Sequence, residues 1–176
     1  MLEHSTLLIN PWAKADGVAK WMRRITDGHG RLLGHVELSG DRAGSWLSWL
    51  RRSRLDVHET PDGSHLLSLT RSWSFSRSWD VYDSEDRHVG TLYTKTIVTG
   101  ANDFVGVIQR NPHGVVGGNR EMLASFAPNA DASLELKFME GTPANPFVRM
   151  LLLGSALTLD PIPPRQTSTD SRGAGF

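Results

Sequence analysis

The sequence predicts an all-β protein made of antiparallel hairpins around one buried C-terminal helix. The stretch ITDGHGRLLGHVEL at 25–38 recurs in altered form as VYDSEDRHVGTLYT at 81–94. Apolar and polar residues alternate on both sides of these turn-forming segments, which is typical of half-buried strands. One long apolar run follows at 147–159. Together these three features indicate a meander of hairpins completed by a helix.

Composition fits one ordinary domain, which we expect to span residues 1–160. The chain has 176 residues, of which 39% are hydrophobic and 22% charged. Nineteen basic residues balance nineteen acidic ones, so the net charge gives no reason to expect nucleic acid as a partner. Cysteine is absent, which excludes disulfides, thiol catalysis and thiolate zinc sites. The first residues lack the pattern of a signal peptide, so we expect a soluble cytoplasmic protein.

The two copies of the recurring stretch each predict a strand, a polar turn and a returning strand. In the first copy, Trp21 to Thr26 enters the turn DGHG and Arg31 to Leu38 returns. In the second copy, Trp79 to Tyr82 enters the turn DSED and His88 to Val98 returns. Asp and Gly suit such turns because they supply local hydrogen bonds and positive φ.

Further strands are expected along the rest of the chain. Residues 54–71 form a looser third hairpin around the turn P-D-G, and Phe104 to Gln109 and Ala132 to Phe138 alternate as strands do. RSWSFSRSWD at 71–80 predicts a strand with one aromatic face. Three glycines within 111–119 indicate a loop.

The apolar run predicts a helix at about 145–159 that is buried in protein. Its thirteen residues from Phe147 to Leu159 would extend roughly 20 Å as a helix. A bilayer core needs about 20 residues, so the run is too short to cross one comfortably. The segment 161–176 is rich in Pro, Ser, Thr and Gly, and we expect a disordered tail there.

These motifs resemble the phospholipid-scramblase and LURP-one-related families of the tubby-like barrel superfamily. The matching segments are ITDGHGRLLGHVE (25–37), LDVHETPDG (55–63), WDVYDSEDRHVGTL (79–92), LELKF (134–138) and MLLLGSALTLD (150–160). The resemblance implies a closed antiparallel barrel of about a dozen strands around the hydrophobic C-terminal helix. It also implies a role in binding phospholipid or membrane surfaces, since tubby proteins bind phosphoinositides through basic surface residues.

The chain departs from the scramblases in ways that argue against calcium-driven lipid scrambling. The cysteine-rich palmitoylation stretch is absent, and the acidic calcium segment has only a faint counterpart at 102–104. Calcium requires six to eight oxygen ligands, several of them from carboxylates. We therefore expect a binding role without a calcium site.

No motif indicates a metal, a cofactor or catalysis. Asp27 and His29 lie in a predicted turn, where a capping Asp and a solvated His are the simpler interpretation. Asp83, Glu85 and Asp86 likewise suit a solvated hairpin tip better than a calcium loop. The glycines at 28–34 lack the strand-to-helix crossover of a dinucleotide site, and neither G-x-S-x-G nor a P-loop occurs. We expect a non-enzyme without cofactors.

The segment SWLSWLRRSR at 45–54 is the strongest candidate for lipid contact. Tryptophan favours the membrane interface and arginine binds phosphate bidentately. The alternative is a solvated connection between hairpins in which one Trp packs against the barrel. The candidate lipid-binding residues are Trp46, Trp49, Arg51, Arg52 and Arg54.

The function expected from these residues is non-catalytic binding of anionic phospholipid headgroups, by a cytoplasmic protein that is peripheral at the membrane. The other hypothesis is an intracellular protein-interaction scaffold without lipid contact. The two differ in surface charge, because a lipid binder should gather its arginines on one face.

Overall fold

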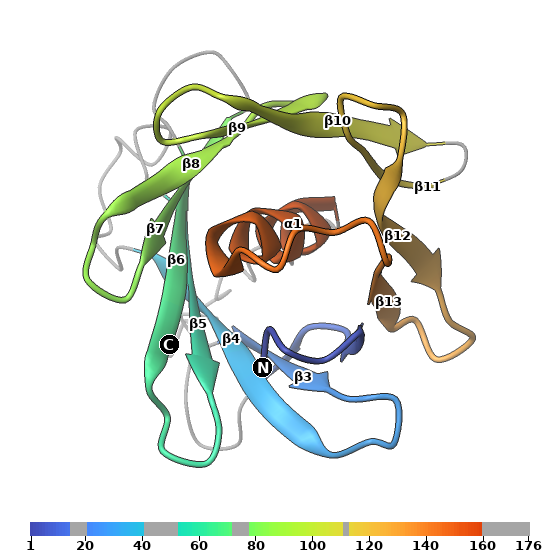
Figure 1. Ribbon diagram of the computed structural model, residues 1–176. Coiled ribbons are helices and arrows are strands. Elements are labelled where there is room, and N and C mark those ends of the chain that lie inside the picture. Colours follow the sequence, from blue (N-terminus) through green and yellow to red (C-terminus); the bar gives the residue numbers. More distant parts are fainter. Residues whose placement is uncertain (15–20, 41–52, 72–77, 111–112, 160–176) are drawn as a thin grey trace, which may run out of the picture.

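The computed structural model describes residues 1–14, 21–40, 53–71, 78–110 and 113–159, which form a closed antiparallel β-barrel around one helix (Figure 1). Twelve of the thirteen strands in these ranges form the ring, and β1 closes it by pairing with both β13 and β3. The short strand β2 pairs with β3. The strands are β1 (Thr6–Ile9), β2 (Ala13–Lys14), β3 (Trp21–Thr26), β4 (Leu32–Gly40), β5 (Ser53–Glu59), β6 (His65–Arg71), β7 (Trp79–Asp83), β8 (His88–Leu92), β9 (Thr96–Thr99), β10 (Phe104–Arg110), β11 (His113–Val116), β12 (Met122–Pro128) and β13 (Leu134–Phe138). The predicted all-β barrel with one helix is confirmed.

The alternating sequence places one face of each strand inside the barrel. On β5 and β6, Leu55 pairs with Leu69 and Val57 with Leu67, and none of these four side chains is exposed. Between them, Asp56 pairs with Ser68 on the opposite, outer face. Apolar residues thus line the interior, and polar residues cover the outer wall.

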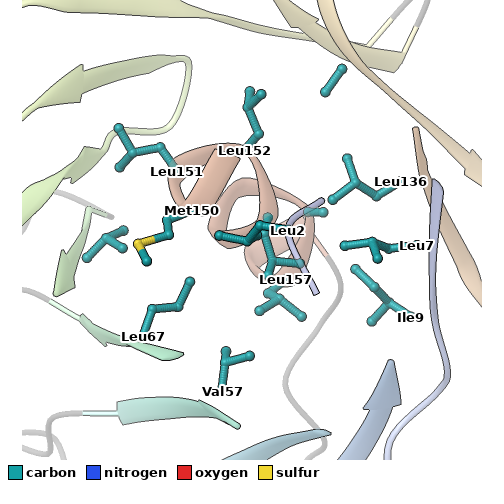
Figure 2. Close-up of a cluster of buried hydrophobic side chains, with 14 of the residues drawn as sticks. Leu2, Leu7, Ile9, Val57, Leu67, Leu136, Met150, Leu151, Leu152 and Leu157 are labelled. Atoms are coloured by element: carbon teal, nitrogen blue, oxygen red, sulfur yellow. The ribbon is translucent and has the colours of Figure 1, made fainter. Parts of the chain in front are cut away.

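The helix α1 (Pro146–Leu159) fills the interior of the barrel. Every residue from Met150 to Leu157 is buried, because strands surround the helix on all sides. Figure 2 shows Leu151, Leu152 and Leu157 pointing in different directions toward the wall. At Gly154 an added Cβ would lie 3.1 Å from a Leu69 methyl carbon, so the helix approaches the wall closely there.

The helix begins with a favourable cap. The backbone N–H of Phe147 donates to the side-chain oxygen of Asn145 at 2.9 Å, and Pro146 occupies the first helical position. Within the described ranges, no helix combines the length and hydropathy needed to span a membrane.

Five hairpins share one turn geometry, which explains why the sequence repeats. In each, the fourth residue's N–H donates to the first residue's carbonyl, and the first residue's N–H donates to the fifth residue's carbonyl. The fourth residue has positive φ, as in a type I turn followed by a bulge residue. The turns are 27–31, 83–87, 99–103, 117–121 and 129–133, with Gly30, Asp86, Asn102, Arg120 and Ala132 at the fourth position.

Each hairpin at one end of the barrel also carries a β-bulge just after its turn. The register shifts leave one extra residue on each returning strand: Leu33, Leu66, Val89, Val105 and Leu123. Bulges bend and twist strands, which helps a sheet to close into a barrel. The residues after three of them are Gly34, Gly90 and Gly106, where an added Cβ would clash with the carbonyl oxygens of His58, Val98 and Val116 respectively. The repeated glycine is therefore required by close approach of the next strand.

The barrel has two distinct ends. We call the end with the connections β3–β4, β5–β6, β7–β8, β9–β10 and β11–β12 the turn end. The opposite end, where β2–β3, β4–β5, β6–β7, β8–β9, β10–β11 and β12–β13 connect, is the loop end. In an antiparallel meander, successive connections alternate between the two ends.

Several predicted elements differ from the structure. The strand expected over 88–98 is two strands, β8 and β9, separated by a turn at 93–95. The loop expected at 111–119 contains β11, and β12 follows where no strand was predicted. Most of the aromatic strand predicted at 71–80, namely 72–77, and the tail predicted at 161–176 lie outside the described residues.

Candidate functional site

Of the five predicted lipid-binding residues, Arg54 belongs to the described part of the chain. It lies on β5, one residue after Ser53, which pairs with Gly40 of β4 at the loop end. The other four, Trp46, Trp49, Arg51 and Arg52, lie outside the described residues. The strand ends that flank their segment nevertheless locate its attachment at the loop end of the barrel.

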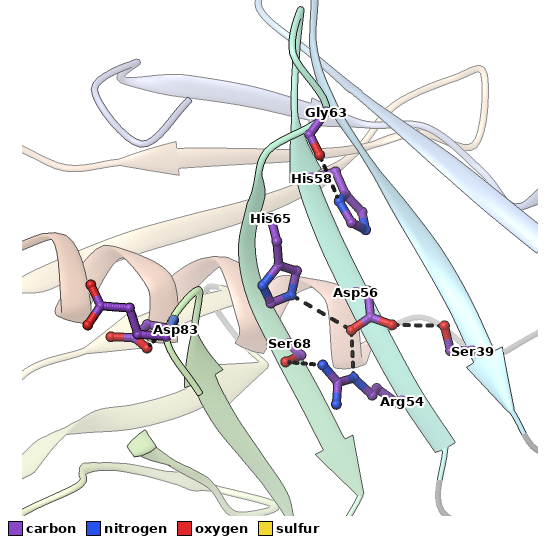
Figure 3. A network of polar contacts seen from close by, with 9 residues as sticks. Ser39, Arg54, Asp56, His58, Gly63, His65, Ser68 and Asp83 are labelled. Atoms are coloured by element: carbon purple, nitrogen blue, oxygen red, sulfur yellow. Dashed lines mark hydrogen bonds and ion pairs between the residues drawn. The ribbon is translucent and has the colours of Figure 1, made fainter. Parts of the chain in front are cut away.

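Arg54 belongs to a polar network on the outer wall (Figure 3). Its Nε donates to Asp56 Oδ1 at 2.6 Å, and its Nη2 donates to the Ser68 hydroxyl at 3.1 Å. The second oxygen of Asp56 accepts a hydrogen bond from Ser39 at 2.8 Å. The Arg54 side chain is 45% exposed, so the network orients the guanidinium while leaving part of it accessible.

Three histidines cross the same wall on neighbouring strands. His35 on β4 stacks on His58 of β5 with ring centroids 5.1 Å apart, and His58 meets His65 of β6 edge-on at 5.5 Å. Burial lowers the pKa of His35, and the nearby His58 lowers it further. Glu37 lies 3.5 Å from His35 and acts in the opposite direction. The cluster favours neutral imidazole at His35 near neutral pH.

The charges of the described connections differ between the two ends. We counted the charged residues of each connection together with the last two residues of the strand before it and the first two of the strand after it. Acidic residues outnumber basic ones at the turn end, and basic residues outnumber acidic ones at the loop end. At the turn end these residues are Asp27, Glu59, Asp62, Asp83, Glu85, Asp86, Asp103 and Glu121 against Arg31, Arg87 and Arg120. At the loop end they are Lys14, Arg54, Arg71, Lys95 and Arg110 against Asp80, Asp131 and Glu135. The balanced net charge therefore conceals an electrostatic polarity along the barrel axis.

Tryptophans share this asymmetry. Trp21 and Trp79 are the first residues of β3 and β7 at the loop end, whereas Trp12 lies beside Arg23 in the middle of β3. Trp79 is partly buried against the core, so it anchors this end of the barrel. The remaining three of the six tryptophans belong, in sequence, to the segments 41–52 and 72–77 that join strands at the same end.

Two carboxylates of the turn end, Asp83 and Asp27, are hydrogen-bonded within their own turns. Asp83 is 2% exposed, and its Oδ1 accepts hydrogen bonds from the backbone N–H groups of Glu85 and Arg87. Its Oδ2 accepts one from Arg87 Nε at 2.8 Å. Burial raises the pKa of Asp83, but these hydrogen bonds and the Arg87 charge outweigh it and hold the pKa below its ordinary value. The turn predicted here is confirmed, although Asp83 is buried rather than solvated.

Asp27 plays the same capping part in the first turn, as predicted. Its Oδ1 accepts hydrogen bonds from the backbone N–H groups of His29 and Arg31, both at 2.9 Å. Backbone donation from Arg31 lowers the pKa of Asp27. Among the described residues, no group of three or more His, Asp or Glu is placed to hold a metal ion.

Comparison with protein-family models, curated proteins and solved structures finds no match to this chain.

Reasoning from the sequence missed the polarity of the barrel, although the signal was present. Connections of a meander alternate between its ends, so charges can be assigned to an end once every strand is known. This alternation was hidden because β11 and β12 were not predicted and because 88–98 was predicted as a single strand. Lys95 and Arg110 in particular were not recognised as neighbours of Arg54 and Arg71 at one end.

Proposed function

We propose that this chain is a non-catalytic barrel that binds anionic phospholipid surfaces through its loop end. The main observation behind this proposal is the segregation of charge, with basic residues in excess at the loop end and acidic residues in excess at the turn end. A basic residue near an anionic membrane contributes about 1 kcal/mol. Several basic residues at one end of the barrel can therefore contribute jointly to the attraction to an anionic membrane.

The segment at 45–54 supplies the lipid-binding residues in this proposal. Trp46 and Trp49 have the amphipathic rings that favour the interface, and Arg51, Arg52 and Arg54 provide phosphate ligands. The interior supports an external site as well, because α1 occupies the barrel with its own apolar side chains.

The resemblance to scramblases and LURP-one-related proteins supports the same class of function. We propose membership of that tubby-like group for the chain, on the hairpin motifs and the apolar helix together. Calcium dependence is left out of the proposal, because both carboxylate oxygens of Asp83 are already hydrogen-bonded within the turn.

The first test is co-sedimentation with neutral phosphatidylcholine vesicles and with vesicles containing phosphatidylserine, at low and moderate salt. The wild-type protein should pellet with anionic vesicles only, and less at higher salt. The variant Trp46→Ala, Trp49→Ala, Arg51→Ala, Arg52→Ala should lose binding. A control, Arg24→Ala with Arg31→Ala, removes two exposed arginines away from the loop end and should retain most binding. Absence of wild-type binding to any vesicle would overturn the proposal.

A protein-interaction scaffold is the second candidate, and exposed apolar side chains at the turn end favour it. Leu32 is 44% exposed, Phe104 51% and Phe147 42%. Leu32 and Phe104 directly follow turns of this end, and Phe147 lies in the first turn of α1. If vesicle binding is absent, a pull-down should compare wild type with Leu32→Ser, Phe104→Ser. A partner lost in that variant would locate the contact at the turn end.

A further inference from the structure

The turn between β8 and β9 presents an aromatic and a basic side chain on a well-held support. Tyr93, Thr94 and Lys95 are all exposed, and Tyr93 is 45% exposed. The Tyr93 N–H donates to the Thr96 carbonyl at 2.8 Å, and the Lys95 carbonyl accepts from Ile108 N–H of β10 at 2.9 Å. Backbone hydrogen bonds therefore hold the turn at both Tyr93 and Lys95, while the exposed side chains remain accessible to a partner.

This turn continues a row of loop-end residues across neighbouring strands. Arg71 of β6 pairs with Trp79 of β7, and Trp79 pairs with Leu92 of β8. Tyr93 comes immediately after Leu92, at the rim of the barrel. On the other side, β10 extends beyond Lys95 to the exposed Arg110. An aromatic ring thus lies among basic residues contributed by three different strands or turns.

We propose that Tyr93 and Lys95 form a second membrane-contacting element, and that the barrel docks on an anionic lipid surface with its loop end facing that surface. This inference rests on the proposed function and adds an orientation and two described contact residues to it. Tyrosine rings favour the headgroup level of a bilayer, and lysine contributes a phosphate-binding point charge.

The dimensions of the barrel favour this end-on orientation. Seven-residue strands such as β5 and β6 rise about 23 Å at roughly 3.3 Å per residue, or about 17 Å along the axis of a barrel with tilted strands. The Debye length at physiological salt is about 8 Å. An acidic turn end held about two Debye lengths from the surface is largely screened. Side-on docking would bring acidic and basic ends to the membrane together.

Acidic groups at the loop end moderate the attraction. Asp80 accepts a hydrogen bond from Thr91 at 2.9 Å and lies 3.8 Å from His88. Asp131 accepts from the backbone N–H and the hydroxyl of Ser133, and these bonds lower its pKa. Asp131 therefore remains anionic at neutral pH. Because the basic excess at this end is small, binding should be strongly salt-dependent.

The test uses the absence of native cysteine to place single labels at the two ends of the full chain. Thr94→Cys labels the tip of the β8–β9 turn, and Gly28→Cys labels a turn-end position where an added Cβ meets no atom within 4 Å. Each variant carries an environment-sensitive fluorophore and is mixed with phosphatidylserine-containing vesicles, with and without spin-labelled lipid. We expect a blue shift and lipid quenching at 94 and neither at 28.

A second measurement compares affinities. Tyr93→Ala with Lys95→Ala should bind these vesicles about tenfold more weakly than wild type. Arg31→Ala with Leu32→Ala removes a similarly exposed apolar side chain and one charge at the turn end, and should bind within about twofold of wild type.

The outcomes separate this inference from the proposed function. Wild-type binding with a silent label at 94 and an unaffected Tyr93, Lys95 variant would overturn the inference and leave the lipid-binding proposal intact. Equal responses at 94 and 28 would overturn the end-on orientation. Failure of wild type to bind would overturn the proposed function, and this inference with it.

Discussion

The two ends of the barrel are built on different principles. At the turn end, short turns and bulges fix the path of the strands through their own hydrogen bonds, and their carboxylates serve the fold. At the loop end, the connections differ in length and carry more basic and aromatic residues. The repeated turn occurs four times at the turn end and once, at 129–133, at the loop end. A repeated motif can thus determine the architecture of one end while most connections of the other end remain free for recognition.

The largest effect should come from the glycine that the bulges require. Gly90→Val places a side chain against the Val98 carbonyl, where even a Cβ would clash. We expect the free energy of unfolding to fall by at least about 3 kcal/mol. Gly28→Ala, in the β3–β4 turn at the same end of the barrel, meets open space and should change the free energy of unfolding by less than about 0.5 kcal/mol. Urea unfolding measures both, and equal stabilities would show that the bulge geometry is wrong.

A smaller effect should distinguish the two matching turn aspartates. Asp83 is buried and bonds the Arg87 guanidinium, whereas Asp27 caps an exposed turn. Asp83→Ala should cost about 2 kcal/mol, as expected for a lost charge-assisted hydrogen bond. Asp27→Ala should cost less. Thermal unfolding of the two variants would contradict this account if Asp27→Ala were the more damaging.

Asp83 should also account for part of the loss of folding stability at low pH. Because the folded pKa of Asp83 lies below its ordinary value of 3.8, its stabilisation is present above that pH. It is lost as the pH falls through the folded pKa. Wild type should therefore lose more stability than Asp83→Ala when the pH is lowered below about 4. Identical acid dependence of the two proteins would contradict the hydrogen-bonded carboxylate.

The smallest effect concerns His35 on the outer wall. Burial and the neighbouring His58 lower its pKa below the ordinary value of 6.5. The unfolded chain then binds a proton more readily, so stability falls as the pH drops from 7.5 toward 5.5. His35→Gln should show a weaker loss over this range in urea unfolding. A loss as steep as that of wild type would assign the pH dependence to other groups.

The sequence was informative about the turn end because its signals are local. An Asp or Gly at a fixed place in a turn acts through hydrogen bonds to residues only a few positions away, as at Asp27 and Asp83. The buried helix was predictable for a related reason. An apolar run too short for a bilayer but apolar on every side requires an enclosing protein wall.

Other features depend on contacts distant in sequence and could not be predicted from local pattern. β1 closes the barrel by pairing with β13, whose sequence contains no sign of that partner. The break at Tyr93 and the bulge residues depend on the neighbouring strands. The polar network of Arg54, Asp56 and Ser68 likewise requires the cross-strand register.

The most direct test of the central claim compares two variants of equal net charge. Arg71→Glu with Arg110→Glu reverses two charges at the loop end, and Arg31→Glu with Arg120→Glu reverses two at the turn end; all four side chains are exposed. Affinity for phosphatidylserine-containing vesicles is measured for wild type and both variants at one salt concentration. We predict that the loop-end variant loses binding, whereas the turn-end variant stays within about threefold of wild type. Equal losses in the two variants would contradict recognition through the loop end.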